Sequence, residues 1–277
     1  MSVYKGKVAV VTGASAGMGR SLSVELARRG AKLAICDVNA VGLAETARLC
    51  EELGAEVKVD VINVAERESV LAWADAVAKQ FGVVHYVFNN AGIAFTGTVE
   101  RSEFKDIERV MDVDFWGVVN GTKAFLPHLL ASGDGHVINT SSVFGLFSMP
   151  TQSAYNAAKF AVRGFTESFR QEMLLTKQPI KVTCVHPGGI KTDIAKNSTT
   201  ADGEGLEAFT KLFDRVATTS ADSAANTILK GTERGQAKVL IGADAHVLDI
   251  IVRLTGSTYQ RLFAEIGGRL LPKSFLR

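Results

Sequence analysis

Tyr155 and Lys159 are the residues of this sequence whose types and spacing best fit chemistry. They lie four positions apart in AYNAAKFAVRGF, a segment typical of a helix, so their side chains share one helix face. An ammonium near a phenol favours the phenolate and lowers a pKa that is ordinarily about 10. The pair predicts proton transfer, with Tyr155 as general base in alcohol oxidation and general acid in carbonyl reduction. The same spacing also occurs on helix surfaces that have no catalytic role.

Ser142 strengthens the catalytic interpretation. It follows the strand predicted for 136–139 and lies thirteen residues before Tyr155. Open α/β sheets bind ligands at the carboxyl ends of their parallel strands. The Ser142 hydroxyl is therefore expected to orient a substrate oxygen beside Tyr155.

The segment KVAVVTGASAGMGR, residues 7–20, indicates a nucleotide site. Its four apolar residues 8–11 predict a buried strand that runs into Gly13, Gly17 and Gly19, and a helical pattern follows at once. Glycines let backbone amides approach a pyrophosphate at the positive end of such a helix.

Ser15 belongs to a competing pattern in the same turn. Residues 13–17 spell G-x-S-x-G, which is typical of the nucleophile elbow of a serine hydrolase. An elbow serine needs earlier strands to carry its oxyanion loop, and only one short strand precedes Ser15. The position of the turn therefore favours the nucleotide site.

Asp37 follows the second apolar run, 32–36, and lies eighteen residues beyond Gly19. A carboxylate at this place in a dinucleotide fold holds the ribose hydroxyls and repels a 2′-phosphate. The glycine turn contains no lysine or arginine, which favours NAD over NADP, while Arg20 directly after the turn keeps NADP open. Alternatively, Asp37 only caps the helix predicted for 40–53.

Strand and helix patterns alternate along the rest of the chain. Strands are expected at 8–11, 32–36, 56–60, 83–88, 136–139, 180–185 and 238–241. Seven short strands separated by helices predict an α/β fold, with a doubly wound parallel sheet of the Rossmann type and helices on both faces. Residues 1–243 are assigned to one dinucleotide-binding and catalytic domain. Residues 244–277 are assigned to a C-terminal helical extension, packed on that domain or at a subunit interface.

The composition argues against several classes of protein. Lys and Arg number 31 against 29 for Asp and Glu, so no net positive field exists to attract a nucleic acid. No pair among the five histidines and three cysteines has metal-ligand spacing, and no metal is expected. The sequence has no secretory leader and no apolar run of the roughly 20 residues that a spanning helix needs. A cytoplasmic protein without disulfides is expected.

Taken together, the motifs resemble those of the short-chain dehydrogenase/reductase family, from Lys5 to about Ile241. The resemblance rests on T-G-x-x-x-G-x-G at 12–19, D-V at 60–61, N-N-A-G at 89–92, Ser142 with Y-x-x-x-K at 155–159, and P-G-G-I-K-T at 187–192. These are several independent motifs, and they occur in the order of the family.

The resemblance implies how the cofactor would be bound. Asp60 and Val61 would contact the adenine, Asn90 and Ala91 would border the ribose, and Lys159 would hold the nicotinamide ribose. Residues 187–192 would line the nicotinamide carboxamide. The expected cofactor-binding set comprises Gly13, Ser15, Gly17, Met18, Gly19, Asp37, Asp60, Val61, Asn90, Ala91, Gly92, Tyr155, Lys159, Pro187, Gly188, Ile190 and Thr192.

Asp114 departs from the family pattern. The family has asparagine here as the fourth member of its catalytic set with Ser142, Tyr155 and Lys159, where it holds a helix distortion and positions a water through its backbone carbonyl. An ionised aspartate accepts hydrogen bonds but donates none. The distortion is therefore expected to be held differently, and the charge of Asp114 to stabilise Lys159 as an ammonium. We expect retained activity with an altered pH dependence.

Apolar residues near Ser142 predict the kind of substrate. Val143, Phe144, Leu146, Phe147, Met149, Pro150 and, after the 89–92 turn, Phe95 either line a pocket or belong to the core. A pocket of this composition favours a small lipophilic secondary alcohol or ketone, and hence an NAD-dependent alcohol dehydrogenase or ketoreductase. An alternative is an NAD(H)-binding redox sensor or scaffold with weakened catalysis, which Asp114 makes conceivable. The serine hydrolase remains a third hypothesis.

The tail after residue 244 has apolar residues at helical spacing. Leu254, Tyr259 and Arg261 also match a loose cholesterol-contact pattern. Packing against the domain or another subunit is favoured over contact with a membrane surface. The resemblance implies a homodimer or homotetramer formed through the long helices expected at 102–130 and 152–175.

Overall fold

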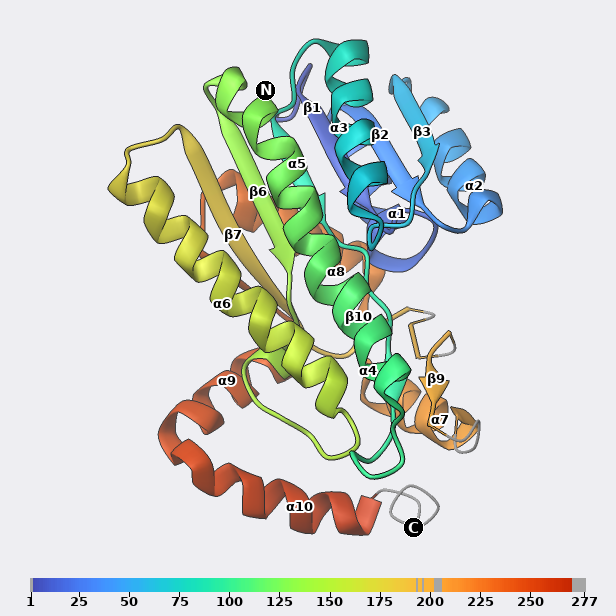
Figure 1. Cartoon of the computed structure of the whole chain (residues 1–277), viewed down its shortest axis with the longest axis vertical. Helices are drawn as coiled ribbons and strands as arrows, with labels where there is room; N and C mark the ends of the chain where they lie inside the picture. The colour runs from blue at the N-terminus through green and yellow to red at the C-terminus, as the bar shows by residue number, and fades with distance from the viewer. Residues whose placement is uncertain (1, 193, 196, 202–205, 271–277) are drawn as a thin grey trace.

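A parallel sheet of seven strands is at the centre of the computed structural model, which describes residues 2–192, 194–195, 197–201 and 206–270 (Figure 1). The strand order is β3-β2-β1-β4-β6-β7-β11, and each neighbouring pair is parallel. The order reverses between β1 and β4, as in a doubly wound fold. The predicted fold class is confirmed. The strands are β1 (Val8–Thr12), β2 (Lys32–Asp37), β3 (Val57–Val61), β4 (Tyr86–Asn89), β6 (Gly135–Thr140), β7 (Ile180–Pro187) and β11 (Lys238–Ile241).

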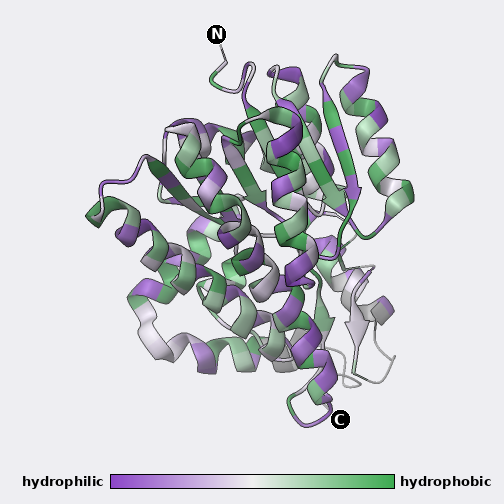
Figure 2. Ribbon diagram, turned by 45° about the horizontal axis from the view of Figure 1, so that its top comes forward, coloured by the Kyte–Doolittle hydropathy of each residue, from purple (hydrophilic) through white to green (hydrophobic). Residues whose placement is uncertain are grey.

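Burial along the strands follows their place in the sheet. All residues of β1, β4 and β6 are buried, and in β1 and β4 this burial explains the nearly continuous apolar runs. The edge strand β3 has no buried residue, and Val59 and Val61 are exposed. Figure 2 shows the same contrast, with hydrophobic central strands and helices that alternate between hydrophobic and hydrophilic residues.

Three helices cover one face of the sheet: α1 (Gly17–Arg28), α2 (Ala40–Glu51) and α8 (Ala221–Glu233). Leu22 and Leu26 of α1 pack with Leu43 of α2 and Ile228 of α8 in one buried cluster. The spacing of these residues along each helix gives the apolar stripe that faces the strands.

Another three helices cover the opposite face: α3 (Arg67–Phe81), α5 (Gly117–Ser132) and α6 (Ser153–Leu175) (Figure 1). Trp73 of α3 and Phe125 of α5 meet edge to face, with ring centroids 5.2 Å apart. Phe169 of α6 belongs to the same buried cluster. The two clusters place the core on both faces of the sheet, as the alternating pattern predicts.

The single helix predicted for 102–130 is interrupted in the structure. It consists of α4 (Phe104–Met111), a π-helical segment η1 (Asp112–Trp116) and α5. The Gly117 amide donates to the Asp112 carbonyl five residues back, which defines the wider turn. One wide turn has no sequence period of its own, so helical spacing alone did not locate it.

Two small parallel pairs were not predicted. β5 (Phe95–Thr96) pairs with β9 (Thr199–Thr200), and β8 (Ile190–Lys191) pairs with β10 (Thr219–Ser220). Strands of two residues are too short to show alternation. They tie the segments that contain α7 (Leu206–Val216) to the carboxyl edge of the sheet.

The chain ends in α9 (Ala243–Thr255), the short η3 (Gly256–Thr258) and α10 (Tyr259–Leu270). Figure 1 shows these helices crossing the end of the molecule at which the strands have their carboxyl ends. Residues 271–277 of the predicted extension lie outside the described residues. In the part of the chain that the structure describes, no helix has the length and apolar character needed to cross a membrane.

Replacing Phe125 by alanine tests the packing between α3 and α5. Its side chain is fully buried, and removing a buried phenyl ring costs about 3 to 5 kcal/mol. We expect Phe125→Ala to lower the free energy of unfolding in urea by about that amount. Leu175→Ala at the exposed end of α6 is the control and is expected to change it by less than about 0.5 kcal/mol. Equal effects of the two substitutions would contradict this account of the core.

Candidate active site

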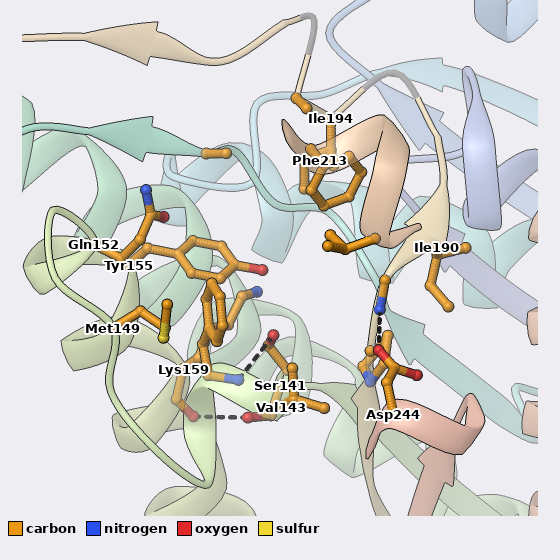
Figure 3. Close-up of a pocket in the computed structure, with 18 of the residues that line it drawn as sticks. Ser141, Val143, Met149, Gln152, Tyr155, Lys159, Ile190, Ile194, Phe213 and Asp244 are labelled. Carbon is orange, nitrogen blue, oxygen red and sulfur yellow. Dashed lines mark hydrogen bonds between the residues drawn. The ribbon is translucent and has the colours of Figure 1, made fainter. Parts of the chain in front are cut away.

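A cavity of about 520 Å³ lies at the carboxyl edge of the sheet, beside Tyr155 (Figure 3). It is lined by ten of the predicted site residues, which arrive from five separate parts of the chain: Met18, Asn90, Gly92, Ser142, Tyr155, Lys159, Pro187, Gly188, Ile190 and Thr192. The other predicted residues lie around the glycine turn and β3, or behind Lys159, and do not line this cavity. The carboxyl edge of the sheet therefore brings Tyr155 and Met18, which follows Gly17 of the glycine turn, to one cavity.

Tyr155 and Lys159 occupy the first two turns of α6 and face the cavity together. The Lys159 ammonium lies 5.4 Å from the centre of the Tyr155 ring. Lys159 is 2% exposed, and its Nζ donates to the Thr140 carbonyl at 3.3 Å. The four-residue spacing thus places the phenol and the ammonium at one site.

Ser142 begins the loop after β6, and its backbone is extended. Its Oγ accepts the amide of Phe144 at 3.1 Å, so the hydroxyl proton is not used in that contact. Its carbonyl accepts a hydrogen bond from His186 Nδ1 at 2.9 Å. Burial lowers the pKa of His186 to about 4, so the imidazole is neutral at pH 7. This contact with His186 positions the backbone of Ser142.

Asp114 lies in η1 and is fully buried. Its Oδ2 is 3.1 Å from Lys159 Nζ, and its Oδ1 accepts the Ile93 amide at 2.8 Å. The expected helix distortion is present at this residue. The carboxylate accepts from a loop amide and pairs with the ammonium, which an aspartate can do without donating a hydrogen bond.

Burial and the two charges act together on the proton-transfer groups. Burial alone would lower the pKa of Lys159, but the Asp114 carboxylate and the Tyr155 phenol together outweigh burial and keep that pKa above its usual value. Burial raises the pKa of Tyr155, the Lys159 ammonium lowers it, and the Asp114 carboxylate raises it further. Asp114 thus favours the ammonium on Lys159 and opposes the phenolate on Tyr155.

The glycine turn between β1 and α1 packs tightly on the loop after β4. Thr12 Oγ1 accepts the amides of Asn90 and Ala91, both at 3.0 Å. A Cβ on Gly13 would lie 2.7 Å from the Cα of Ala91, and one on Gly19 would lie 2.0 Å from the Gly13 carbonyl oxygen. Side chains are thus excluded at these positions by the neighbouring backbone.

Asp37 at the end of β2 contacts the same turn. Its Oδ2 accepts the Ser15 amide at 3.0 Å, and its Oδ1 accepts the Asn39 amide at 2.9 Å. The cap of α2 is made by Asn39, whose side chain accepts the Gly42 amide. The alternative role of Asp37 as that cap is therefore wrong. Arg20 donates to the carbonyls of Ser15 and Gly42, so its guanidinium braces the turn.

Asp60 lies in β3, beside β2 in the sheet, with its Cα paired in register with Cys36. Its carboxylate accepts from Trp73 Nε1 at 2.8 Å and from Lys58 Nζ at 3.0 Å. Val61 follows it and is 59% exposed. Both residues lie on the same side of the β1/β4 crevice as Asp37, as the adenine half of a dinucleotide site requires.

The loop after β7, predicted to line the nicotinamide, is held from the C-terminal part of the chain. The Gly188 amide donates to the Ile241 carbonyl at 2.9 Å, and the Gly189 amide donates to Asp244 Oδ2 at 2.7 Å (Figure 3). A Cβ on Gly188 would lie 2.2 Å from Asp244 Oδ2. Sequence reasoning missed Asp244, and no local motif indicates it because its partner lies 55 residues earlier.

Most of the apolar residues predicted near Ser142 line the cavity: Val143, Phe144, Phe147, Met149 and Pro150. Leu146 and Phe95 do not line the cavity and are packed in hydrophobic clusters, which is the other of the two alternatives. Further apolar lining comes from Ile194, Phe213, Val216, Leu248, Phe263 and Ile266.

The residues around the glycine turn fit a dinucleotide. No side chain caps the N-terminus of α1, so its first amides can bind a ligand such as a pyrophosphate. Gly13 and Gly19 let the turn pack against its own backbone and the loop after β4. Within the described residues, no three His, Cys, Asp or Glu side chains are grouped as a metal site.

Comparison with known proteins identifies the family. Residues 7–203 match the family described as short chain dehydrogenase. The chain belongs to this family. SadH of Mycobacterium tuberculosis H37Rv is 60% identical over 273 residues, which cover 98% of this chain and 99% of SadH. Human estradiol 17-beta-dehydrogenase 11 is 34% identical over 203 residues, covering 73% of this chain and 68% of that protein.

A solved structure also resembles this short-chain dehydrogenase over most of its length. The Burkholderia phymatum short chain dehydrogenase/reductase in complex with NAD is 30% identical, with a TM-score of 0.84. The match covers 95% of this chain and 97% of that protein. The chain is therefore an oxidoreductase of this family, and the hydrolase hypothesis for Ser15 is set aside.

Proposed function

We propose that this protein transfers a hydride between NAD(H) and a lipophilic secondary alcohol or ketone. The observation that carries the proposal is the position of the Tyr155 phenol between Lys159 and a mostly apolar cavity. When bound, the cofactor supplies or accepts the hydride. The residues of the chain bind the reactants, orient them and move the proton.

Tyr155 is the proposed general acid and base. In oxidation its phenolate oxygen takes the proton of the substrate hydroxyl, and in reduction its phenol returns a proton to the carbonyl oxygen. Lys159 stabilises the phenolate, and Asp114 holds Lys159 through the buried ion pair. Ser142 Oγ accepts the Phe144 amide, and its hydroxyl acts on the Tyr155 phenol and lowers the pKa of that phenol, so Ser142 lies where it can orient a substrate oxygen beside Tyr155.

NAD is the proposed cofactor because of the charges near the ribose. The Asp37 carboxylate lies beside the glycine turn, where it would repel a 2′-phosphate. Arg20 is hydrogen-bonded to the backbone and to Thr46, so it is not directed at such a phosphate. The NAD complex of the Burkholderia relative is consistent with this choice.

We further propose a homodimer or homotetramer formed through α5 and α6. Phe160 of α6 is 39% exposed, and Trp116 next to α5 is 43% exposed. Aromatic exposure of this kind is typical of protein interfaces. A cytoplasmic location stays a prediction.

The alternative is a redox sensor or scaffold that binds NAD(H) with weakened catalysis. The proton-transfer groups of Ser142, Tyr155 and Lys159 meet at one cavity, which a protein that only binds does not require. Turnover of a panel of secondary alcohols and ketones distinguishes the two hypotheses. Tight NADH binding without turnover of any member would favour the sensor.

Tyr155→Phe tests the catalytic proposal directly. The substitution keeps the ring in place and removes only the proton-transfer oxygen, so we expect kcat to fall by about 100-fold or more. NADH affinity, measured by fluorescence titration, is expected to stay within about twofold. Tyr86→Phe in β4 is the matched control and should keep activity. A loss smaller than about tenfold would assign the proton transfer to another group.

Asp114→Asn tests the electrostatic role of the buried carboxylate. The oxidation rate rises with pH as Tyr155 loses its proton, and the Asp114 charge raises that pKa. Removing the charge should move the rising limb of the pH profile of kcat to lower pH. Asp112→Asn, an exposed aspartate in the same π-helical segment, should leave the profile unchanged. An unmoved profile in Asp114→Asn would refute this role.

Comparing NAD and NADP binding tests the assignment of Asp37. We expect NAD to bind at least about tenfold more tightly, because a phosphate near the carboxylate is repelled. Asp37→Asn keeps an acceptor for the Ser15 amide while removing the charge, so it should reduce the ratio of NAD affinity to NADP affinity. Glu51→Ala, at the far end of α2, controls for a general change of charge. Tighter binding of NADP by the unaltered protein would overturn the assignment.

A further inference from the structure

A continuous wall of aromatic rings connects Tyr155 with the last helix of the chain. Phe144 meets Tyr155 edge to face at 6.1 Å between ring centroids, and Phe147 meets Phe144 at 5.4 Å. Phe263 of α10 then meets Phe147 at 5.3 Å. We call Tyr155, Phe144, Phe147 and Phe263 the aromatic wall. An apolar group attached to the reacting carbon can follow this wall without leaving apolar surroundings.

The C-terminal helices complete the cavity at the end away from the sheet. Leu248 of α9 and Phe263 and Ile266 of α10 are among its lining residues. These three positions lie beyond residue 203, where the match to the family ends. The substrate end of the cavity therefore depends on a part of the chain that the general family pattern does not specify.

Two hydrogen bonds hold these helices at the site. At the start of α9, Asp244 accepts the Gly189 amide of the loop after β7 at 2.7 Å. At the start of α10, the Tyr259 hydroxyl accepts the Ser148 amide at 3.0 Å, in the loop that also contains Phe144 and Phe147. Tyr259 is 8% exposed and packs against Phe263, with ring centroids 5.3 Å apart. These hydrogen bonds thus fix the first turns of α9 and α10 beside the aromatic wall.

Among its described lining residues, the cavity offers no unpaired cation. Lys159 and Asp244 carry the formal charges; Lys159 is paired with Asp114, and Asp244, one turn before Leu248 on α9, accepts the Gly189 amide. Leu248, Phe263 and Ile266 offer no partner to a charged group. Burying an unpaired carboxylate there would cost several kcal/mol.

We infer that α9 and α10 form the part of the substrate pocket that determines specificity. These helices select secondary alcohols whose alkyl tail is long, apolar and uncharged. They reject an alcohol of the same length whose tail ends in a carboxylate. This inference rests on the proposed function, since it assigns the tail of the substrate that Tyr155 acts on.

Two alcohols of equal length provide the test. 2-Dodecanol and 11-hydroxydodecanoate differ only in having a methyl group or a carboxylate at the end remote from the hydroxyl. We expect kcat/KM of the unaltered enzyme to favour 2-dodecanol by at least about tenfold, because the carboxylate loses its hydration in the pocket. 2-Butanol, which is too short to reach α10, serves as the reference substrate.

Ile266→Arg places a cation at the remote end of the pocket. Ile266 is 42% exposed, so the longer side chain can be accommodated without unfolding the helix. We expect the preference for 2-dodecanol over 11-hydroxydodecanoate to fall by at least about tenfold, because the added guanidinium pairs with the carboxylate. Leu262→Arg is the matched control, one turn earlier on α10, 49% exposed and outside the cavity lining. It should retain the preference of the unaltered enzyme.

The outcomes separate this inference from the proposed function. Suppose that the unaltered enzyme oxidises alcohols but Ile266→Arg and Leu262→Arg show the same preference for 2-dodecanol over 11-hydroxydodecanoate. Then α10 does not contact the tail of the substrate, and the inference fails. If no alcohol or ketone is turned over, the proposed function fails. Binding then tests the wall: 2-dodecanone should raise the melting temperature of the NADH-loaded protein, and Ile266→Arg but not Leu262→Arg should abolish the shift. Equal shifts in both variants would also refute the inference.

Discussion

The buried ion pair of Lys159 and Asp114 is the interaction on which the site depends. Both side chains are removed from water, and breaking such a pair leaves an uncompensated charge that costs about 3 to 5 kcal/mol. The pair connects α6 with η1, while the Thr140 carbonyl ties the same ammonium to β6. Gly92 is closely fitted beside it, since a Cβ there would lie 3.3 Å from Lys159 Nζ. The proposed proton transfer at Tyr155 thus relies on three elements that meet at the Lys159 ammonium.

The parallel sheet determines where this charge meets the reactants. Its strands all end at one edge, so the glycine turn after β1, the loop after β4, Ser142 after β6 and the loop after β7 become neighbours. Short backbone contacts then hold them together, as when Thr12 accepts the amides of Asn90 and Ala91. The part of the site around the glycine turn is therefore held mostly by backbone contacts. The substrate half is built from side chains of later segments, which leaves its chemistry open to variation within one fold.

The features of the fold and the site that the sequence predicted are formed by residues close together in the sequence. The spacing of Tyr155 and Lys159 and the order of glycines each involve residues within one turn or one strand-turn-helix unit. The parts that it missed involve long separations: Asp244 meets Gly189 across 55 residues, and Tyr259 meets Ser148 across 111. Leu146 and Phe95 were left undecided by the sequence and belong to the core, because apolar character alone does not separate a lining residue from a core residue.

By itself, the sequence determined the doubly wound sheet, the glycine turn and the serine, tyrosine and lysine at the carboxyl edge, because apolar periodicity and motif spacing are local properties of the chain. Only the tertiary structure decided how the departure at Asp114 is accommodated: a π-helical segment brings the carboxylate to Lys159 and to the Ile93 amide. It also decided that α9 and α10 enclose the cavity. Both results depend on the packing of segments distant in sequence, for which no local pattern exists.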